Sequence, residues 1–255
     1  GATMEAGTAM LYATLGFGGL SITNFLPGTP LFENWIRAFD RFIGACNLGG
    51  LAYELFPAFD QGQADYAMAA ATRSGHLLTL QAGLKAELNA MTGGSGEVPL
   101  FLRQPSSWTV NSVGYNMAQS AAILSDVDTA LANPTKLILC GPQYANPHYR
   151  AGDVHTDAEG KHWEGISLGR AIQNYRTGAA TKAIWCTGVS NAGTTITATF
   201  NNTTQLALTS GVSNTADGQY GLVLFPWSNV NSLISLGTFN VPTLNTITAV
   251  AGSAL

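Results

Sequence analysis

The chain has 255 residues and a formal net charge of −4, and only 10% of its residues are charged. An average soluble domain has roughly 25% charged residues, so this low share favours an extracellular or virion-borne protein. Lysine and arginine form no cluster, which argues against a nucleic-acid partner. No apolar run reaches the roughly 18 residues of a membrane-spanning helix. The hydrophobic share of 46% is enough for a real core, so we expect a globular protein.

The three cysteines, Cys46, Cys140 and Cys186, lie far apart in the sequence. They show neither Cys-x-x-Cys nor Cys/His spacing, so the sequence predicts no zinc site and no complete disulfide framework. We therefore expect buried free thiols. No metal ion and no organic cofactor is expected.

Amphipathic helices and short apolar strands alternate through the first part of the chain. Residues 30–46 place Leu31, Trp35 and Phe39 at helical spacing, after a proline suited to a first helical turn. Further helices are expected over 66–91, 115–132 and 159–175, and buried strands over 98–102 and 136–141. This alternation predicts an α/β fold, in which a parallel sheet is flanked by helices in three layers.

The pattern changes after residue 177. β-forming residues cluster between Gly, Asn and Ser turns over 183–186, 195–200, 205–208 and 221–225. We therefore predict two domains, an α/β domain over 1–177 and a small all-β sandwich over 178–255.

The most informative segment for chemistry is 152–165, where a carboxylate and a histidine lie in a loop that opens a helix. A serine esterase needs an imidazole base to take the serine proton and a carboxylate to fix the imidazole tautomer. His155 and Asp153 could form this pair. The alternative is that Asp157 only caps the helix and His155 is a surface loop residue.

This segment resembles the last conserved block of SGNH (GDSL-like) hydrolases, where an Asp-x-x-His loop runs into the C-terminal helix. Residues 61–66, Gln-Gly-Gln-Ala-Asp-Tyr, are similar to the third block of the sialate O-acetylesterase-like branch, and residues 15–22 resemble the second block. Residues 98–108 and 138–144 resemble strands of esterase modules found in phage tail proteins. The resemblance implies a three-layer SGNH-type domain that removes O-acetyl groups from polysaccharide without a cofactor.

The resemblance also implies roles for individual residues. His155 would act as base and then as acid, with Asp153 orienting it, while the Gly19 N–H and the Gln63 side chain would hold the oxyanion. Gln63 replaces the commoner glutamate, and a neutral amide can donate a hydrogen bond to an oxyanion. Because the blocks of such domains converge at the C-terminal strand ends, we expect His155 near Gly19 and Gln63.

Four further residues are expected next to this site. Gly62 and Asp65 would be structural, with Asp65 as the N-cap of the helix that follows. The alternative for Asp65 and Gln63 is that both only tie the loop to the helix start. Trp108 is a candidate for stacking on a sugar ring, and His148 is a candidate substrate contact or a solvated loop residue.

Two departures from the family pattern concern the catalytic groups. The first block, Gly-Asp-Ser or Gly-Gln-Ser, carries the nucleophile, and neither tripeptide occurs in the chain. Ser21 lies in the second block and has too little chain before it for a strand with a nucleophile. The residue three before His155 is Gly152, so the carboxylate of Asp153 stands one position late, which leaves its role open.

The missing first block leads to an expectation about partners. We expect another polypeptide segment to supply the first strand and the nucleophilic serine, and we expect a homo-oligomer such as a trimer. The alternative function is a non-catalytic structural or glycan-binding virion module on the same SGNH scaffold.

Overall fold

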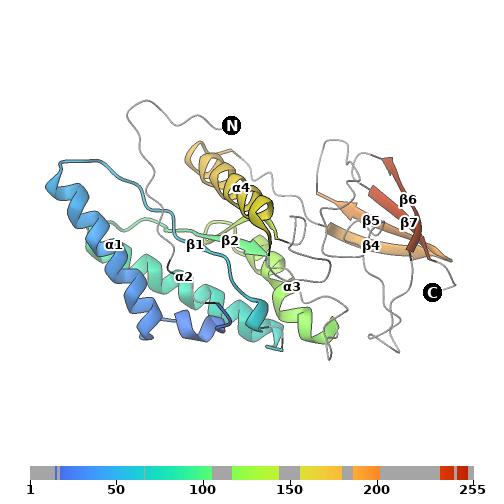
Figure 1. Ribbon diagram of the computed structural model, residues 1–255, viewed down its shortest axis with the longest axis horizontal. Coiled ribbons are helices and arrows are strands. Elements are labelled where there is room, and N and C mark those ends of the chain that lie inside the picture. The colour runs from blue at the N-terminus through green and yellow to red at the C-terminus, as the bar shows by residue number, and fades with distance from the viewer. Residues whose placement is uncertain are drawn as a thin grey trace.

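A three-stranded parallel sheet, in the order β1-β2-β3, carries the first part of the chain (Figure 1). Its strands are Ala58–Phe59, Leu100–Gln104 and Leu137–Pro142. The computed structural model describes residues 15, 18–65, 67–104, 117–143, 156–179, 186–201, 236–243 and 246–251. The confirmed α/β class follows from the parallel pairing and from the helices between the strands.

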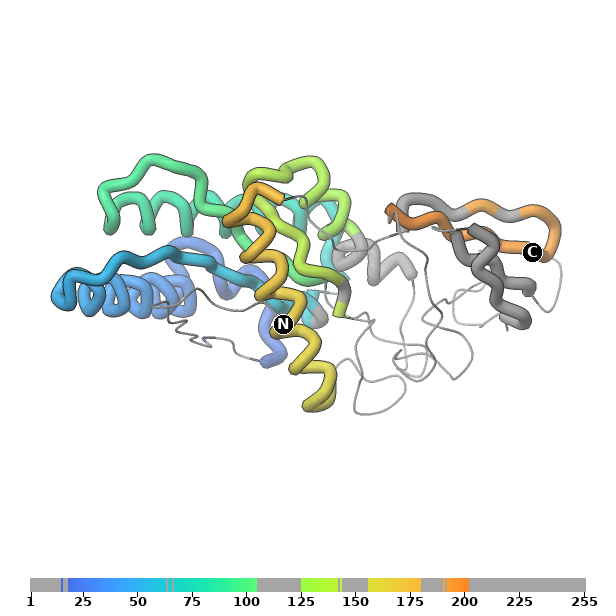
Figure 2. Tube along the Cα trace, turned by 90° about the horizontal axis from the view of Figure 1, so that it is seen from above, coloured from blue at the N-terminus to red at the C-terminus, as the bar shows by residue number. Residues whose placement is uncertain are grey.

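Among the described residues, four α-helices pack around this sheet: α1 (Pro30–Leu48), α2 (Ala70–Thr92), α3 (Met117–Ala132) and α4 (Ala158–Arg176). Two short 3₁₀ helices, η1 (Ile22–Phe25) and η2 (Gln63–Asp65), precede α1 and α2. The helix α1 begins where the sequence predicts, because the Thr29 hydroxyl accepts a hydrogen bond from Phe32 N and Pro30 fills the first turn. The helices α1 and α2 lie side by side (Figures 1 and 2).

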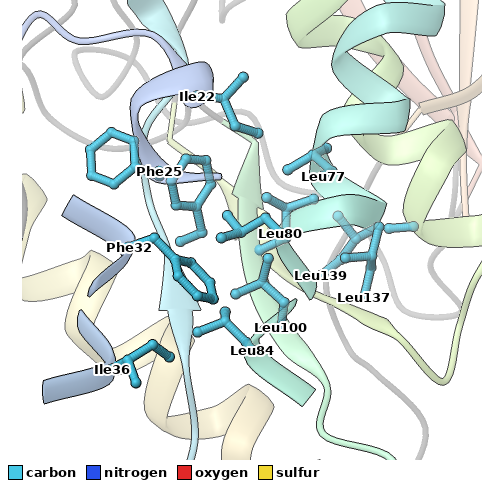
Figure 3. Packing of buried hydrophobic residues seen from close by; sticks show 13 residues of the cluster. Ile22, Phe25, Phe32, Ile36, Leu77, Leu80, Leu84, Leu100, Leu137 and Leu139 are labelled. Carbon is cyan, nitrogen blue, oxygen red and sulfur yellow. The ribbon is translucent and has the colours of Figure 1, made fainter. Parts of the chain in front are cut away.

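The sheet is covered on both faces because its strand side chains alternate. Leu100 and Leu102 pack in one cluster with η1, α1 and α2, whereas Phe101 packs in a second cluster with Ala171 of α4. The expected three layers are therefore present. Figure 3 shows the first cluster, in which side chains from the helices and the strands point toward one another: Ile22, Phe25, Phe32, Ile36, Leu77, Leu80, Leu84, Leu100, Leu137 and Leu139.

Cys46 and Cys140 are buried free thiols, as the sequence predicts. Burial raises the pKa of the Cys140 thiol to about 12, so this thiol stays protonated at neutral pH. The side chain of Cys186 lies outside the described residues.

The start of α2 differs from the prediction, which placed it at Tyr66 with Asp65 as its N-cap. The helix begins at Ala70, and its N-cap is Ala69, which makes no side-chain capping bond. The cap prediction is wrong because the Asp65 carboxylate binds the backbone of Ile22 instead. The end of the helix agrees with the prediction, since Gly93 closes it in the left-handed conformation with φ 68°.

The second part of the chain forms a four-stranded antiparallel sheet with the order β4-β5-β7-β6. The strands are Cys186–Ala192, Thr195–Phe200, Leu236–Thr243 and Thr246–Ala251. The strand predicted over 195–200 is confirmed. The strands predicted over 205–208 and 221–225 fall outside the described residues, so the second sheet of a sandwich and the boundary at 177/178 stay predictions.

Gly83 of α2 marks a close approach between that helix and the segment before α1. A Cβ atom at this position would lie 2.4 Å from Pro27 Cγ and 3.2 Å from Phe32 Cζ. We expect Gly83→Ala to lower the free energy of unfolding by about 1–3 kcal/mol, because the rigid proline ring must move. Gly75→Ala in the same helix is the matched control: a Cβ there meets open space, so a gain of about 0.5–1 kcal/mol is expected. Chemical denaturation of both variants checks this, and equal effects would contradict the close approach.

Candidate functional site

Asp65 joins the two glycine-rich segments that were predicted to form the oxyanion hole. Its carboxylate accepts hydrogen bonds from Ile22 N, at 3.0 Å to Oδ2 and 3.3 Å to Oδ1. Asp65 is only 2% exposed, so these bonds are shielded from water. The segment that follows Gly19 is therefore held against the segment that contains Gln63.

Arg73 holds the Asp65 carboxylate in place from α2. Its Nη1 lies 2.7 Å from Asp65 Oδ2, and its Nε and Nη2 each donate at 2.7 Å to the carboxylate of Asp126 in α3. Nη2 also donates to the Gln61 carbonyl oxygen at 3.1 Å. Arg73 and Asp126 are fully buried. One guanidinium thus compensates two buried carboxylates and connects α2 and α3 to the loop after β1.

A third buried carboxylate, that of Glu164 in α4, accepts hydrogen bonds at the C-terminal edge of the parallel sheet. Its Oε1 accepts from Gln143 Nε2 at 3.0 Å and from Thr156 Oγ1 at 2.8 Å. Its Oε2 accepts from Lys161 Nζ at 2.8 Å and lies 3.4 Å from Arg103 Nη1. We call these five residues the Glu164 cluster. The cluster fixes one helix to the ends of β2 and β3 and to Thr156.

Arg103 extends this cluster to β1. Arg103 is the next-to-last residue of β2, is 6% exposed, and donates from Nη2 to the Glu164 carbonyl oxygen at 2.6 Å. Its Nη1 also pairs with the carboxylate of Asp60, which directly follows β1. After β3, Gln143 N donates to the Gln104 carbonyl oxygen at 2.8 Å. The C-terminal ends of all three parallel strands therefore contribute polar groups to one edge, where α/β sheets bind their ligands.

The donors around Glu164 decide its protonation state. Burial acts to raise the pKa of Glu164, but hydrogen bonds from Lys161, Thr156 and Gln143 and the charge of Arg103 outweigh it, so the pKa is lowered. The carboxylate stabilises the fold above the pKa of an unfolded glutamate, about 4.3. That contribution is lost as the pH falls through the lowered value of the folded state.

The structure describes some of the predicted site residues in part. Gly19 is exposed, has a φ of +74°, and a Cβ atom placed on it would meet nothing within 4 Å, so its backbone is open to a ligand. Gly62 and Asp65 are buried. The backbone of Gln63 lies in η2, while its side chain is outside the described residues. The oxyanion role of Gly19 and Gln63 stays a prediction.

The other predicted site residues, His155, Asp153, Trp108 and His148, lie outside the described residues. Thr156, the neighbour of His155, is described and is 3% exposed.

Sequence reasoning missed four charged residues that organise this edge: Arg73, Asp126, Arg103 and Glu164. The sequence does contain a signal for Arg103, because this residue directly follows the apolar run Leu100–Leu102 of a buried strand. Arginine is almost never fully buried without a partner, so an arginine at this position indicates a buried ion pair. No recognisable motif marks Arg73, Asp126 or Glu164, and each has at least one partner more than 20 positions away in the sequence.

Buried polar atoms without partners lie beside these clusters. Within the described ranges, neither Nε2 nor Oε1 of Gln61 has a hydrogen-bond partner, and the same holds for Nε of Arg103. Buried polar groups are nearly always hydrogen-bonded.

Membrane spans and metal centres are both absent from the part of the chain that the structure describes. No helix of that part is long and apolar enough to cross a membrane. No group of three or more His, Cys, Asp or Glu side chains there is arranged to hold a metal ion.

Comparison with known proteins gives distant structural similarity only. No family model matches the sequence, and no curated protein matches it. The structure is similar to a crystal structure of a carbohydrate acetylesterase from Xanthomonas citri, with 13% sequence identity and a TM-score of 0.45. The similarity covers 78% of this chain and 42% of that chain, so the chain spans less than half of the other protein's length. Any function of this chain must therefore be inferred from its own residues.

Proposed function

We propose that this chain provides the base and the oxyanion hole of a carbohydrate O-acetylesterase, and that another polypeptide segment provides the nucleophilic serine. The observation that carries the proposal is the buried Asp65 carboxylate bound to Ile22 N, because it links the two segments whose Gly19 and Gln63 would hold an oxyanion. An oxyanion hole needs donors fixed before the reaction begins. The fully buried Arg73 donates a hydrogen bond to the Asp65 carboxylate and so restricts its movement.

The proposed reaction proceeds through an acetyl-enzyme. The serine hydroxyl attacks the acetyl carbonyl carbon while His155 takes its proton, with Asp153 orienting the imidazole. The oxyanion accepts hydrogen bonds from Gly19 N–H and the Gln63 amide. The C–O bond to the sugar then breaks, and His155 returns the proton to the leaving sugar oxygen. Water, deprotonated by His155, attacks the acetyl-enzyme and releases acetate and the free serine.

Two features support the placing of the base and of the partner segment. Thr156 is bound to Glu164 at the C-terminal edge of the sheet, so the chain next to His155 is held at that edge. Within the described residues, β1 pairs only with β2, which leaves its other side for a further strand. The proposed setting is extracellular or on a virion, as a homo-oligomer such as a trimer that acts on acetylated polysaccharide.

The experiment that tests the proposal identifies the reactive serine. A fluorophosphonate probe bonds covalently to an activated serine, and the labelled peptide is found by mass spectrometry. We expect no label on the 255-residue chain alone, and a label on a serine outside it in the native assembly purified from its source. A label on Ser21 or another serine of this chain would overturn the external nucleophile.

A non-catalytic glycan-binding module is the second candidate, because neither Gly-Asp-Ser nor Gly-Gln-Ser occurs in the chain. A native assembly that takes up no label and releases no acetate from acetylated polysaccharide would decide for this candidate.

A further inference from the structure

We propose that the side chains of Asp60 and Lys161 bind the hydroxyl groups of a carbohydrate at the C-terminal edge of the parallel sheet. The class of ligand rests on the proposed function, but the inference does not depend on the catalytic scheme. Asp60 directly follows β1, and Lys161 lies near the start of α4. Both side chains reach solvent, since that of Asp60 is 31% exposed and that of Lys161 is 57% exposed.

Buried partners hold both side chains in place. Arg103, which is 6% exposed, donates from Nη1 to Asp60 Oδ2. Glu164, which is 3% exposed, accepts a hydrogen bond from Lys161 Nζ at 2.8 Å. Arg103 Nη1 and Glu164 Oε2 are themselves 3.4 Å apart, so one buried pair supports both exposed groups. Polar groups that are fixed before binding lose less conformational entropy when a ligand arrives.

Both side chains keep hydrogen-bonding capacity for a ligand. Asp60 Oδ2 is used by Arg103, whereas Oδ1 accepts no hydrogen bond from any residue that the structure describes. An ammonium group has three N–H donors, and Lys161 uses one of them for Glu164. A sugar hydroxyl has one donor and two acceptor lone pairs, so it can donate to Asp60 or accept from Lys161. Such bonds are roughly twice as strong as those between neutral groups.

The charges at this position favour a neutral ligand. Burial raises the pKa of Asp60, and the charges of Arg103 and Lys161 oppose that rise, so the charge of Lys161 acts on Asp60. The two cations and the carboxylates of Asp60 and Glu164 cancel in net charge. An anion or a cation would be attracted by one exposed group and repelled by the other. A neutral ligand with several hydroxyl groups meets no such repulsion.

The test begins with an array of bacterial, plant and algal polysaccharides, which is incubated with the labelled 255-residue chain. The polysaccharide that is bound most strongly then serves to measure Kd for each variant. We expect Lys161→Met and Asp60→Asn each to raise Kd about ten- to hundredfold, the loss of one charge-assisted hydrogen bond. Lys161→Arg keeps a cationic donor and should restore most of the affinity.

Lys85→Met is the matched control for Lys161→Met. Lys85 also forms a partly exposed ion pair, with Glu97, but this pair precedes β2 and so lies at the opposite end of the sheet. We expect Lys85→Met to leave Kd unchanged. Both lysine variants should unfold at similar urea concentrations, because exposed ion pairs contribute little to stability. Should Asp60→Asn prevent folding, Lys161→Met alone decides.

The outcomes separate this inference from the proposed function. A chain that binds no polysaccharide of the array, or a Lys161→Met variant with unchanged Kd, would overturn the binding site. If the chain binds and Lys161→Met weakens binding, but the native assembly releases no acetate, the site stands and the esterase proposal fails. If the assembly releases acetate and Lys161→Met leaves its KM unchanged, the esterase proposal stands and the site fails.

Discussion

Arg73→Met is expected to lower the free energy of unfolding by about 3–5 kcal/mol, a large part of the roughly 5–15 kcal/mol that stabilises a domain. The substitution leaves the carboxylates of Asp65 and Asp126 buried without their shared cation. Removing one partner of a buried ion pair lowers the free energy of unfolding, because the remaining charge is left with neither water nor an opposite charge. Urea denaturation at neutral pH measures the loss.

The pH dependence of the free energy of unfolding tests the role of Arg73 independently. Burial raises the pKa of Asp126, and the hydrogen bond and charge of Arg73 oppose that rise. Without Arg73 the folded-state pKa rises further, and a raised carboxyl pKa makes the fold relatively more stable at lower pH. We therefore expect the difference between variant and wild type to shrink as the pH falls.

Arg37→Met is the matched control for Arg73→Met. Arg37 lies on the exposed face of α1, and its guanidinium contacts Asn34. Its replacement should change the free energy of unfolding by no more than about 0.5 kcal/mol. An Arg73→Met variant as stable as Arg37→Met would show that the buried cation contributes no more than an apolar side chain of similar size.

His155→Ala is expected to reduce acetate release by about 1,000-fold or more, because loss of the base of a triad removes both proton transfers. His162→Ala is the matched control, since His162 is exposed on α4. It should keep nearly full activity. Release of acetate from acetylated polysaccharide by the native assembly is the measurement.

Two further variants sharpen the assignment of the catalytic groups. Ser21→Ala should keep most of the activity, and a large loss there would place the nucleophile within this chain. Asp153→Ala with full activity would show that this carboxylate does not orient His155. A His155→Ala protein with unchanged activity would contradict the whole catalytic scheme.

Sequence reasoning predicted well where a local pattern decides the structure. The helix α1 was predicted from apolar spacing and from Pro30 in its first turn, and the Asp157 cap of α4 was one of the two alternatives for that segment. The alternation of helices and apolar strands was enough for the parallel sheet. The two-residue strand β1 was missed, because Ala58 and Phe59 are too short a run for any periodicity.

Sequence patterns are local, and this also explains which residues of the candidate site could be predicted. Gly19 and Gln63 could be proposed from the sequence because each lies in a short recognisable block, and their role stays a prediction. The partnership of Arg73 with Asp126 joins residues 53 positions apart, and that of Arg103 with Glu164 joins residues 61 apart. No window of the sequence contains both members of such a pair. The wrong N-cap for α2 has the same cause, since Asp65 is used by a residue 43 positions earlier.

The arrangement around Glu164 also constrains the order in which the chain can fold. Arg103 in β2 meets its carboxylate only when α4, which is made later, docks on the sheet. Contacts between residues far apart in sequence form late, because closing the intervening loop costs entropy first. An intermediate that has the sheet but not α4 holds Arg103 without Glu164, and its strand ends lack their fixed geometry. We therefore expect this edge of the sheet to reach its final geometry only after α4 has docked.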